Sequence, residues 1–282
     1  MSDSSRSMTG VGISERNFKR LAAYIERELG IRMPDTKRVM LESRLQKRLR
    51  VLNLGSFDAY IDRIFAGDDG EIIHMIDAVT TNKTDFFREP DHFDVLVSRL
   101  LPSLMARHPG RTGFAFWSAG CATGEEPYTL AMSLEEFRLG HKDFDYHIVA
   151  SDISTRALDS AANAVYGIER VAPVPPSYRK KYLLRSRDPD RSEVRIKKEL
   201  RDKVEFIRLN FMDEHFPFEG HFDVIFCRNV IIYFERPVQE RILGRMCKYL
   251  SVGGALILGH SETLTGMDLP LVSLAPTVYE RV

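Results

Sequence analysis

The stretch Trp117-Ser-Ala-Gly-Cys-Ala-Thr-Gly-Glu-Glu-Pro-Tyr128 decides how this chain folds. It overlaps a short apolar run, Gly113 to Ser118, that predicts a buried strand, and it leads into a helical pattern from Tyr128 to Phe137. Between them, Gly120 and Gly124 let the backbone come close to a ligand. Open α/β sheets bind ligands at the carboxyl ends of their strands. The stretch therefore predicts a strand, a ligand-binding loop and a helix.

The acidic residues of this loop indicate which ligand it suits. The loop is not G-x-G-x-x-G, and Glu125 and Glu126 stand where a pyrophosphate would lie. Carboxylates repel a diphosphate but attract a sulfonium or an amino group, which favours S-adenosylmethionine over NAD or ATP. A simpler explanation is a tight turn whose acidic residues favour the helix dipole. The loop alone leaves both explanations open.

Strands and helices keep alternating beyond this loop. Four further apolar runs predict strands at residues 146–151, 204–209, 222–227 and 254–259. Helical patterns follow at 156–165 and 237–250. This alternation predicts a mostly parallel sheet with helices on both faces. Two segments, 271–274 and 277–282, are too close for a crossover helix and predict an antiparallel hairpin at the sheet edge.

Residues 178–203 interrupt the alternation. Segments 180–185 and 193–197 flank the turn-rich Asp188-Pro189-Asp190 and predict a small antiparallel hairpin. This segment carries eleven basic and five acidic side chains. We expect it to form a β-subdomain inserted in the larger domain.

The chain before residue 90 has only helical patterns. Four apolar stripes between residues 13 and 79 predict four helices, the first capped by Ser14 and ended near Gly30. Residues 1–12 are rich in Ser and Gly and predict a flexible tail. The expected organisation is therefore a tail at 1–12, an all-helical domain at 13–79, a linker at 80–98 and the α/β domain at 99–282.

Composition excludes several classes of protein. The 282 residues include 40 basic and 40 acidic side chains, and 44% are apolar, as in a globular protein. Zero net charge argues against a bulk nucleic-acid binder. Three Cys are too few for a disulfide framework, and eight scattered His have no metal-like spacing, so we expect no metal. The absence of a long apolar run predicts a cytoplasmic protein that does not insert in a membrane.

Polar residues follow three of the predicted strands and converge on one edge of the sheet. They are Asp152, the pair Asn210 and Phe211, and the pair Arg228 and Asn229. An acid such as Asp152 can accept hydrogen bonds from ribose hydroxyls, and Asn210 with Phe211 could contact adenine. Asp152 could equally cap the next helix, although Ser154 could also do so, and Asn is common in ordinary loops.

Two other segments could serve function. In the linker, Phe86 and Phe87 stand beside Arg88, which indicates a segment that packs over the ligand rather than one that merely connects. In residues 36–52, six basic side chains oppose one acidic side chain, and Arg44, Lys47 and Arg48 share one helical face. A solvated face is the ordinary explanation of charged stripes, but a stripe of one sign suits an acidic helix or nucleic acid.

Five motifs occur in an order and spacing that resemble one family along nearly the whole chain. They are Thr81-Asn-Lys-Thr-Asp-Phe-Phe-Arg88, Ala122-Thr-Gly-Glu-Glu-Pro-Tyr128, Ser151-Asp-Ile153, Phe226-Cys-Arg-Asn-Val-Ile-Ile-Tyr-Phe234 and Gly259-His-Ser-Glu262. The sequence resembles the CheR-type chemotaxis protein-glutamate O-methyltransferases. The resemblance implies an all-α domain followed by a class I, Rossmann-like methyltransferase domain with a small β-subdomain.

The resemblance also implies a ligand site. The residues at positions matching S-adenosylmethionine contacts are Asn82, Thr84, Arg88, Gly120, Glu125, Glu126, Asp152, Ile153, Asn210, Phe211, Arg228 and Asn229. Arg88, Arg228 or Tyr233 would orient the acceptor carboxylate, and S-adenosylhomocysteine would be the product. Arg44, Lys47 and Arg48 would contact the cytoplasmic methylation helices of chemoreceptors. Such an enzyme is expected to be a monomer that is recruited to membrane receptor arrays and binds no nucleic acid.

One feature departs from the family pattern. Some members grip a pentapeptide at the receptor's C-terminus through a Gly-rich loop of the β-subdomain, but residues 184–194 contain no glycine. We therefore expect docking that does not depend on the pentapeptide. Two alternatives remain: a nucleic-acid methyltransferase, and an adapter or sensor that binds S-adenosylmethionine or S-adenosylhomocysteine without turnover. Against the first, Arg228-Asn-Val-Ile231 lacks an Asn-Pro-Pro-aromatic sequence; against the second, the loop and Asp152 are intact.

Overall fold

The structure, a computed structural model, describes residues 12–188 and 190–282. The predicted tail therefore lies outside the described residues, except for Gly12. The chain divides into two compact units, Met1–Thr81 and Asn82–Val282, and each is described by itself. No helix in the described ranges is long and apolar enough to cross a membrane.

The first unit is the predicted set of four helices. They are α1 (Glu15–Leu29), α2 (Arg38–Val51), α3 (Phe57–Phe65) and α4 (Asp69–Val79), with a short 3-10 turn, Asp35–Lys37, before α2. Ser14 caps α1 by accepting a hydrogen bond from Asn17 N, and Gly30 ends it in a left-handed conformation. Each helix buries its apolar stripe, for example Leu41 and Leu45 of α2.

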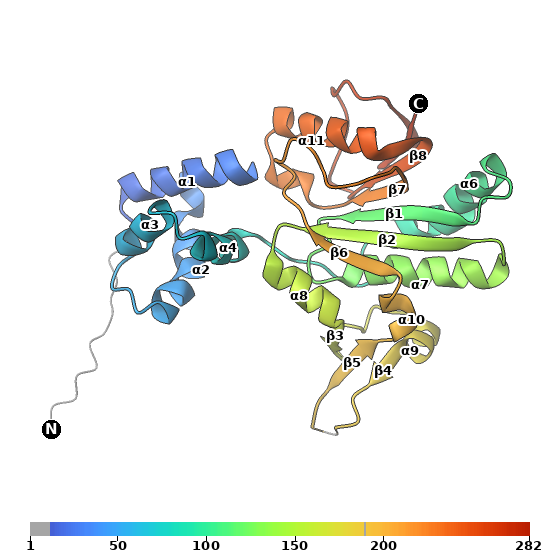
Figure 1. Cartoon of the computed structure of the whole chain (residues 1–282), viewed down its shortest axis with the longest axis horizontal. Coiled ribbons are helices and arrows are strands. Elements are labelled where there is room, and N and C mark those ends of the chain that lie inside the picture. Colours follow the sequence, from blue (N-terminus) through green and yellow to red (C-terminus); the bar gives the residue numbers. More distant parts are fainter. Residues whose placement is uncertain (1–11, 189) are drawn as a thin grey trace. The chain divides into compact units, whose positions relative to one another are not determined.

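The second unit is built on a seven-stranded sheet with the order β6-β2-β1-β7-β8-β10-β9 (Figure 1). Its strands are β1 (Gly113–Ala119), β2 (Asp145–Asp152), β6 (Val204–Arg208), β7 (Phe222–Cys227), β8 (Leu250–Leu258), β9 (Leu271–Ala275) and β10 (Val278–Arg281). The first five in this order pair in parallel, and β10 joins β8 and β9 antiparallel. The predicted fold class and edge hairpin are confirmed.

Helices cover both faces of this sheet. Successive side chains of a strand point to opposite faces, so each strand contributes to two cores. Phe116 belongs to one apolar core and Trp117 to the other. The first core includes side chains of α5 (Asp91–Val95), the π-helical turn Leu96–Leu100, α6 (Leu101–Arg107), α7 (Glu125–Gly140) and α8 (Thr155–Asn163). The second includes those of α11 (Arg236–Tyr249). The central strands β1, β2, β7 and β8 have long buried runs, as parallel strands covered on both faces do.

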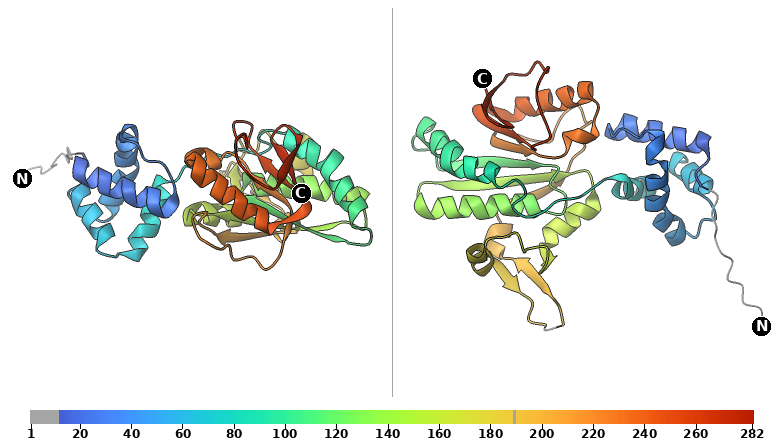
Figure 2. Two further views of the ribbon diagram at one scale, coloured as in Figure 1. Left: turned by 90° about the horizontal axis from the view of Figure 1, so that it is seen from above. Right: turned by 180° about the vertical axis from the view of Figure 1, so that it is seen from behind.

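The β-subdomain is larger than predicted. It is a three-stranded antiparallel sheet, β3-β5-β4, made of β3 (Val165–Gly167), β4 (Leu183–Arg185) and β5 (Glu193–Ile196), with α9 (Pro176–Tyr182) and α10 (Lys198–Arg201). It lies beyond the β6 edge, away from the β9–β10 hairpin (Figure 1, Figure 2).

Two predicted boundaries in this region are wrong. Residues 180–182 belong to α9 rather than to a strand. The helix predicted to run to Val165 ends at Asn163, because Ala164 adopts a left-handed conformation with φ of 54° and Val165 begins β3. The turn residue Pro189 of the predicted hairpin lies outside the described residues.

Candidate functional site

The loop after β1 is held tightly against the ends of neighbouring strands. Gly120 N and Cys121 N donate to the Ser151 carbonyl at 2.8 and 2.9 Å, which joins the ends of β1 and β2. Gly120 has φ of 83°, and a Cβ there would collide with Val230, so this position requires glycine. Gly124 has φ of 96° and precedes α7. The carboxyl ends of β1, β2 and β7 therefore meet at one place.

Asp152 anchors this loop from the end of β2. Its Oδ2 accepts from Ala122 N and its Oδ1 from Ser154 N, each at 2.9 Å. Ser154, not Asp152, caps α8 with its side chain, so the capping explanation of Asp152 fails. Asn82 Nδ2 donates to Ser154 Oγ at 3.3 Å, which brings the start of the linker to the same strand end. Ile153 is partly buried beside them.

A buried guanidinium links two carboxylates at the next strand end. Arg228 is 5% exposed, and its Nη atoms lie 3.1 Å from Glu89 Oε2 and 3.4 Å from Glu126 Oε2. It also donates to the Arg88 carbonyl, while within the described chain its Nε has no hydrogen-bond partner. Ser118 donates to Glu126 at 2.7 Å. Burial raises the pKa of Glu126, and the charge of Arg228 only partly opposes this.

Sequence reasoning gave no role to Glu89, yet it is central to this cluster. Burial alone would raise its pKa, but hydrogen bonds from Asn229 Nδ2, at 3.2 Å, and from Arg228 hold the pKa below its usual value. Phe87, Glu89 and Asn229 all have left-handed backbone conformations, with φ of 53°, 52° and 58°. Left-handed non-glycine residues cluster at functional sites. Only the position of Glu89 beside the Phe-Phe-Arg motif could have indicated it.

Glu262 holds the loop after β7 in place through backbone hydrogen bonds. It is 4% exposed and accepts hydrogen bonds from three backbone N–H groups, those of Asn229 at 2.8 Å, Val230 at 2.9 Å and Gly259 at 2.7 Å. Burial raises its pKa although these hydrogen bonds favour the charged form. Glu262 therefore fixes the backbone that carries Asn229, and the last of the five motifs contained it without a role.

Glu125 has partners of a different kind from those of Glu126. It is 1% exposed, accepts from Thr123 Oγ1 at 2.6 Å, and forms an ion pair with Arg170. Arg170 also donates to the Thr84 carbonyl at 3.2 Å, and Tyr166 Oη donates to the Thr123 carbonyl at 2.8 Å. Tyr166 lies in β3 and Arg170 in the loop after it. No local sequence pattern indicated either residue.

The residues expected at the adenine side lie at the end of β6. Asn210 Oδ1 accepts from Met212 N at 3.0 Å, an ordinary loop contact. Phe211 is 9% exposed and packs against Trp117, with ring centroids 6.5 Å apart. Leu209 N donates to the Asp152 carbonyl at 3.0 Å, which keeps this loop at the end of β2.

The three residues expected to orient an acceptor differ in exposure. Arg228 is buried, whereas Arg88 and Tyr233 are partly exposed. Arg88 Nη1 donates to the Lys83 carbonyl at 3.3 Å, and Tyr233 ends the 3-10 turn Ile231–Tyr233 after β7. Arg228 is thus the most firmly positioned of the three.

The basic side chains of α2 do not form one exposed face. Arg44 donates to the Val79 carbonyl at 2.6 Å and the Thr80 carbonyl at 3.0 Å, so it caps α4. Arg48 makes two hydrogen bonds to Glu71, at 2.8 and 2.6 Å. Lys47 is exposed. Of the three residues predicted to dock a receptor, two therefore have partners within their own unit.

Comparison with known proteins identifies the family. Residues 16–80 match the all-alpha domain of CheR methyltransferases, and residues 82–278 match their SAM binding domain. "Chemotaxis protein methyltransferase 2" of Pseudomonas aeruginosa is 39% identical over 266 residues, or 94% of this chain and 93% of its own. The chemotaxis protein methyltransferases of Borreliella burgdorferi and Escherichia coli are 35% and 36% identical, covering 96% and 95% of this chain and 96% and 92% of their own. The chain belongs to the CheR methyltransferase family.

Proposed function

We propose that this protein transfers the methyl group of S-adenosylmethionine to glutamate carboxylates of chemoreceptors and forms methyl esters. The observation that carries the proposal is the cluster of Glu126, Asp152 and Arg228 at adjoining strand ends in a domain of this family. Relatives that match nearly the whole chain are named chemotaxis protein methyltransferases. The carboxylates of Asp152, which is buried, and Glu126, which is 14% exposed, suit a ligand with an amino group and ribose hydroxyls.

Each predicted contact receives a role in this proposal. Asp152 would hold the ribose. Glu126 would hold the amino group, because Glu125 is occupied by Arg170 and Thr123, whereas Glu126 shares its Arg228 with Glu89. Glu125 would then support the loop indirectly. The remaining contacts would come from Asn82, Thr84 and Arg88 of the linker, Gly120 and Ile153 of the loops, Asn210 and Phe211 near adenine, and Arg228 and Asn229 near the reacting group.

The chemistry asks mainly for positioning. Bound S-adenosylmethionine supplies an electrophilic methyl group on a sulfonium. A glutamate side chain, with a reference pKa of about 4.3, is already a carboxylate at pH 7, so no strong general base is required. Holding the two reactants in line can contribute about 7–11 kcal/mol, and exclusion of water helps because opposite charges disappear.

Arg228 is suited to orient an acceptor carboxylate without binding it too tightly. Its charge is opposed by those of Glu89 and Glu126, so it attracts a further carboxylate less than an unpaired Arg would. A full Arg–carboxylate pair would stabilise the nucleophile and slow its attack. Arg88 and Tyr233 remain proposed as additional orienting groups.

Receptor docking would use the exposed side of α2. Lys47 and Arg50 are exposed there, together with Val39 and Val51, which are 74% and 60% exposed. A surface of basic and apolar side chains suits an acidic amphipathic helix. Lys47→Glu with Arg50→Glu is expected to abolish receptor methylation and leave cofactor affinity unchanged. Equal loss of both would contradict a docking role, as would full methylation.

We also propose that docking does not require a C-terminal pentapeptide. The β-subdomain has a groove of about 330 Å³, lined by Ile168, Val171, Arg179, Lys180, Leu183, Arg185 and Val194. The hairpin beside it lacks the glycines that would let a peptide backbone approach closely. A receptor tail that enhanced methylation would be expected to bind in this groove.

One experiment tests activity and tail dependence together. The enzyme is mixed with methyl-labelled S-adenosylmethionine and receptor-containing membranes, with and without a C-terminal pentapeptide, and base-released methanol is collected. Base-labile label on both kinds of receptor is the expected result. Label on tailed receptors alone would contradict tail independence. No label, with S-adenosylhomocysteine still bound in a titration, would favour the adapter or sensor.

A further inference from the structure

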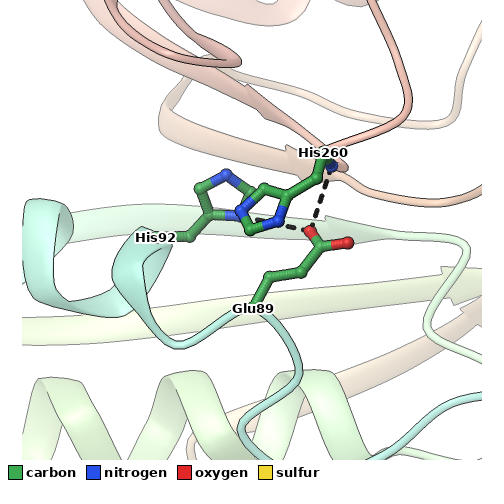
Figure 3. A group of neighbouring side chains, drawn as sticks. All are labelled: Glu89, His92 and His260. Atoms are coloured by element: carbon green, nitrogen blue, oxygen red, sulfur yellow. Dashed lines mark hydrogen bonds and ion pairs between the residues drawn. The ribbon is translucent and has the colours of Figure 1, made fainter.

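Two histidines and a carboxylate converge at one side of the second unit. Glu89, His92 and His260 each place one ligand atom within 4.8 Å of the others (Figure 3). Glu89 and His92 come from the segment that leads into α5, whereas His260 follows β8 and is 171 residues from Glu89. The fold, rather than sequence spacing, creates this group, which is why the pattern of histidines predicted no metal.

The hydrogen bonds of His92 leave one ring nitrogen with a free lone pair. His92 is 1% exposed, and its Nε2 lies 2.8 Å from Thr277 Oγ1. The Thr277 hydroxyl donates to the Pro276 carbonyl at 2.8 Å, so Nε2 must donate to Thr277. Nδ1 then faces Glu89 Oε2, 3.5 Å away, as one acceptor facing another. Within the described chain this buried Nδ1 has no hydrogen-bond partner.

His260 is oriented in a similar way. Its Nε2 lies 3.0 Å from Asp91 Oδ2, which leaves Nδ1 as the nitrogen able to bind an ion. Histidine ligands of metals usually donate their other ring N–H to a carboxylate or another oxygen, and both histidines here do so. The side chain of His260 is 51% exposed, which provides an entry path from solvent.

Glu89 keeps capacity for a cation although it already has donors. An ionised carboxylate offers about four lone-pair sites. Arg228 Nη2 and His260 N donate to Oε2, at 3.1 and 3.3 Å, and Asn229 Nδ2 donates to Oε1 at 3.2 Å, so the remaining lone pair lies on Oε1. An ion would bind through Oε1, or replace one of the two donors to Oε2. The nearby charge of Arg228 opposes a second cation, so an ion here would bind less tightly than in a dedicated structural site.

We propose that Glu89, His92 and His260 form a binding site for a divalent transition-metal ion of the zinc type. Two imidazoles with one carboxylate suit Zn²⁺ or Co²⁺, whereas Mg²⁺ and Ca²⁺ prefer oxygen ligands. Solvent would complete the coordination. A bound ion would join the segment that carries Arg88 and Glu89 to the end of β8, and so fix the surroundings of Arg228.

The test measures metal binding by the full chain, independently of methyl transfer. After chelator treatment, calorimetric titration with ZnCl₂ is expected to show one site, and MgCl₂ none. His260→Ala should weaken Zn²⁺ binding at least tenfold. His147→Ala is the matched control, because His147 is also 51% exposed and lies 3.4 Å from a carboxylate, that of Glu205. It should bind Zn²⁺ as the wild type does.

Two further measurements keep the proposal open to contradiction. Asp91→Asn, an exposed position, should weaken Zn²⁺ binding about tenfold by releasing the orientation of His260. The Co²⁺ complex should lack the intense near-ultraviolet absorption of a cobalt–thiolate bond. Equal Zn²⁺ affinity in wild type and His260→Ala would overturn the proposal, and so would thiolate absorption, which would place the ion on a cysteine. Neither result would affect the proposed methyl transfer.

Discussion

Arg48 and Arg228 are both paired with carboxylates, but their surroundings differ. In the helical domain, Arg48 makes two hydrogen bonds to Glu71, which also accepts from Tyr60 Oη at 2.8 Å. One cation meets one anion, and the set is complete. In the methyltransferase domain, Arg228 is shared by two carboxylates, and its Nε has no partner among the described residues. The fully paired Arg48 and Glu71 stabilise the helical domain, whereas Arg228 keeps an N–H group that can bind a ligand.

The largest expected effect is loss of stability in the helical domain. Arg48→Ala would leave Glu71, which is 3% exposed, as an uncompensated buried charge. Breaking such a pair costs about 3–5 kcal/mol of unfolding free energy. Urea unfolding measures it, with Lys47→Ala as the exposed control expected within about 0.5 kcal/mol of wild type. Similar values for the two variants would show that the Arg48 pair does not hold the fold.

At Arg228 we expect the loss to fall on activity instead. Arg228→Lys keeps the charge but cannot reach Glu89 and Glu126 together, since an ammonium lacks the planar fork. Methyl transfer should fall about 100-fold, equivalent to about 2.7 kcal/mol, while unfolding free energy changes little. Arg138→Lys, at an i,i+3 pair with Glu135, serves as the control. A drop in stability as large as the drop in activity would erase the contrast with Arg48.

Asp152→Ala should weaken ligand binding. Loss of the proposed ribose contact, and of the bond to Ala122 N, is expected to weaken S-adenosylhomocysteine binding at least tenfold, or about 1.4 kcal/mol. Titration of both proteins measures the change. Unchanged affinity would remove the ribose assignment and leave Asp152 as a support of the loop.

The smallest effect concerns pH and has opposite signs in the two regions. Burial alone would raise the pKa of Glu71, but Arg48 and Tyr60 hold it below the usual value, so Glu71 adds stability that is lost as pH falls through that lowered pKa. Burial raises the pKa of Glu126, so its contribution is present at low pH and is lost as pH rises. Glu71→Gln and Glu126→Gln should therefore change the slope of unfolding free energy against pH in opposite directions. Equal slopes would refute the distinction.

Local patterns predicted the features that depend on local physics. Ser14 and Gly30 marked the ends of α1 because caps act on their own helix, and apolar runs marked the strands because parallel strands are buried on both faces. The pairing of Arg48 with Glu71, and of Glu125 with Arg170, could not be predicted, because each joins residues 23 or 45 positions apart. The strand β3 could not be predicted for a different reason: its three residues are too few to show an alternating pattern.

The contacts of Arg170 have a consequence for protein engineering. Because Arg170 and Tyr166 bond the loop after β1 at Glu125 and Thr123, the β-subdomain is no removable module. A chimaera that exchanges subdomains between relatives should cross over after Arg170. A cut at Val165 would discard both side chains and leave the carboxylate of Glu125, which is 1% exposed, without Arg170.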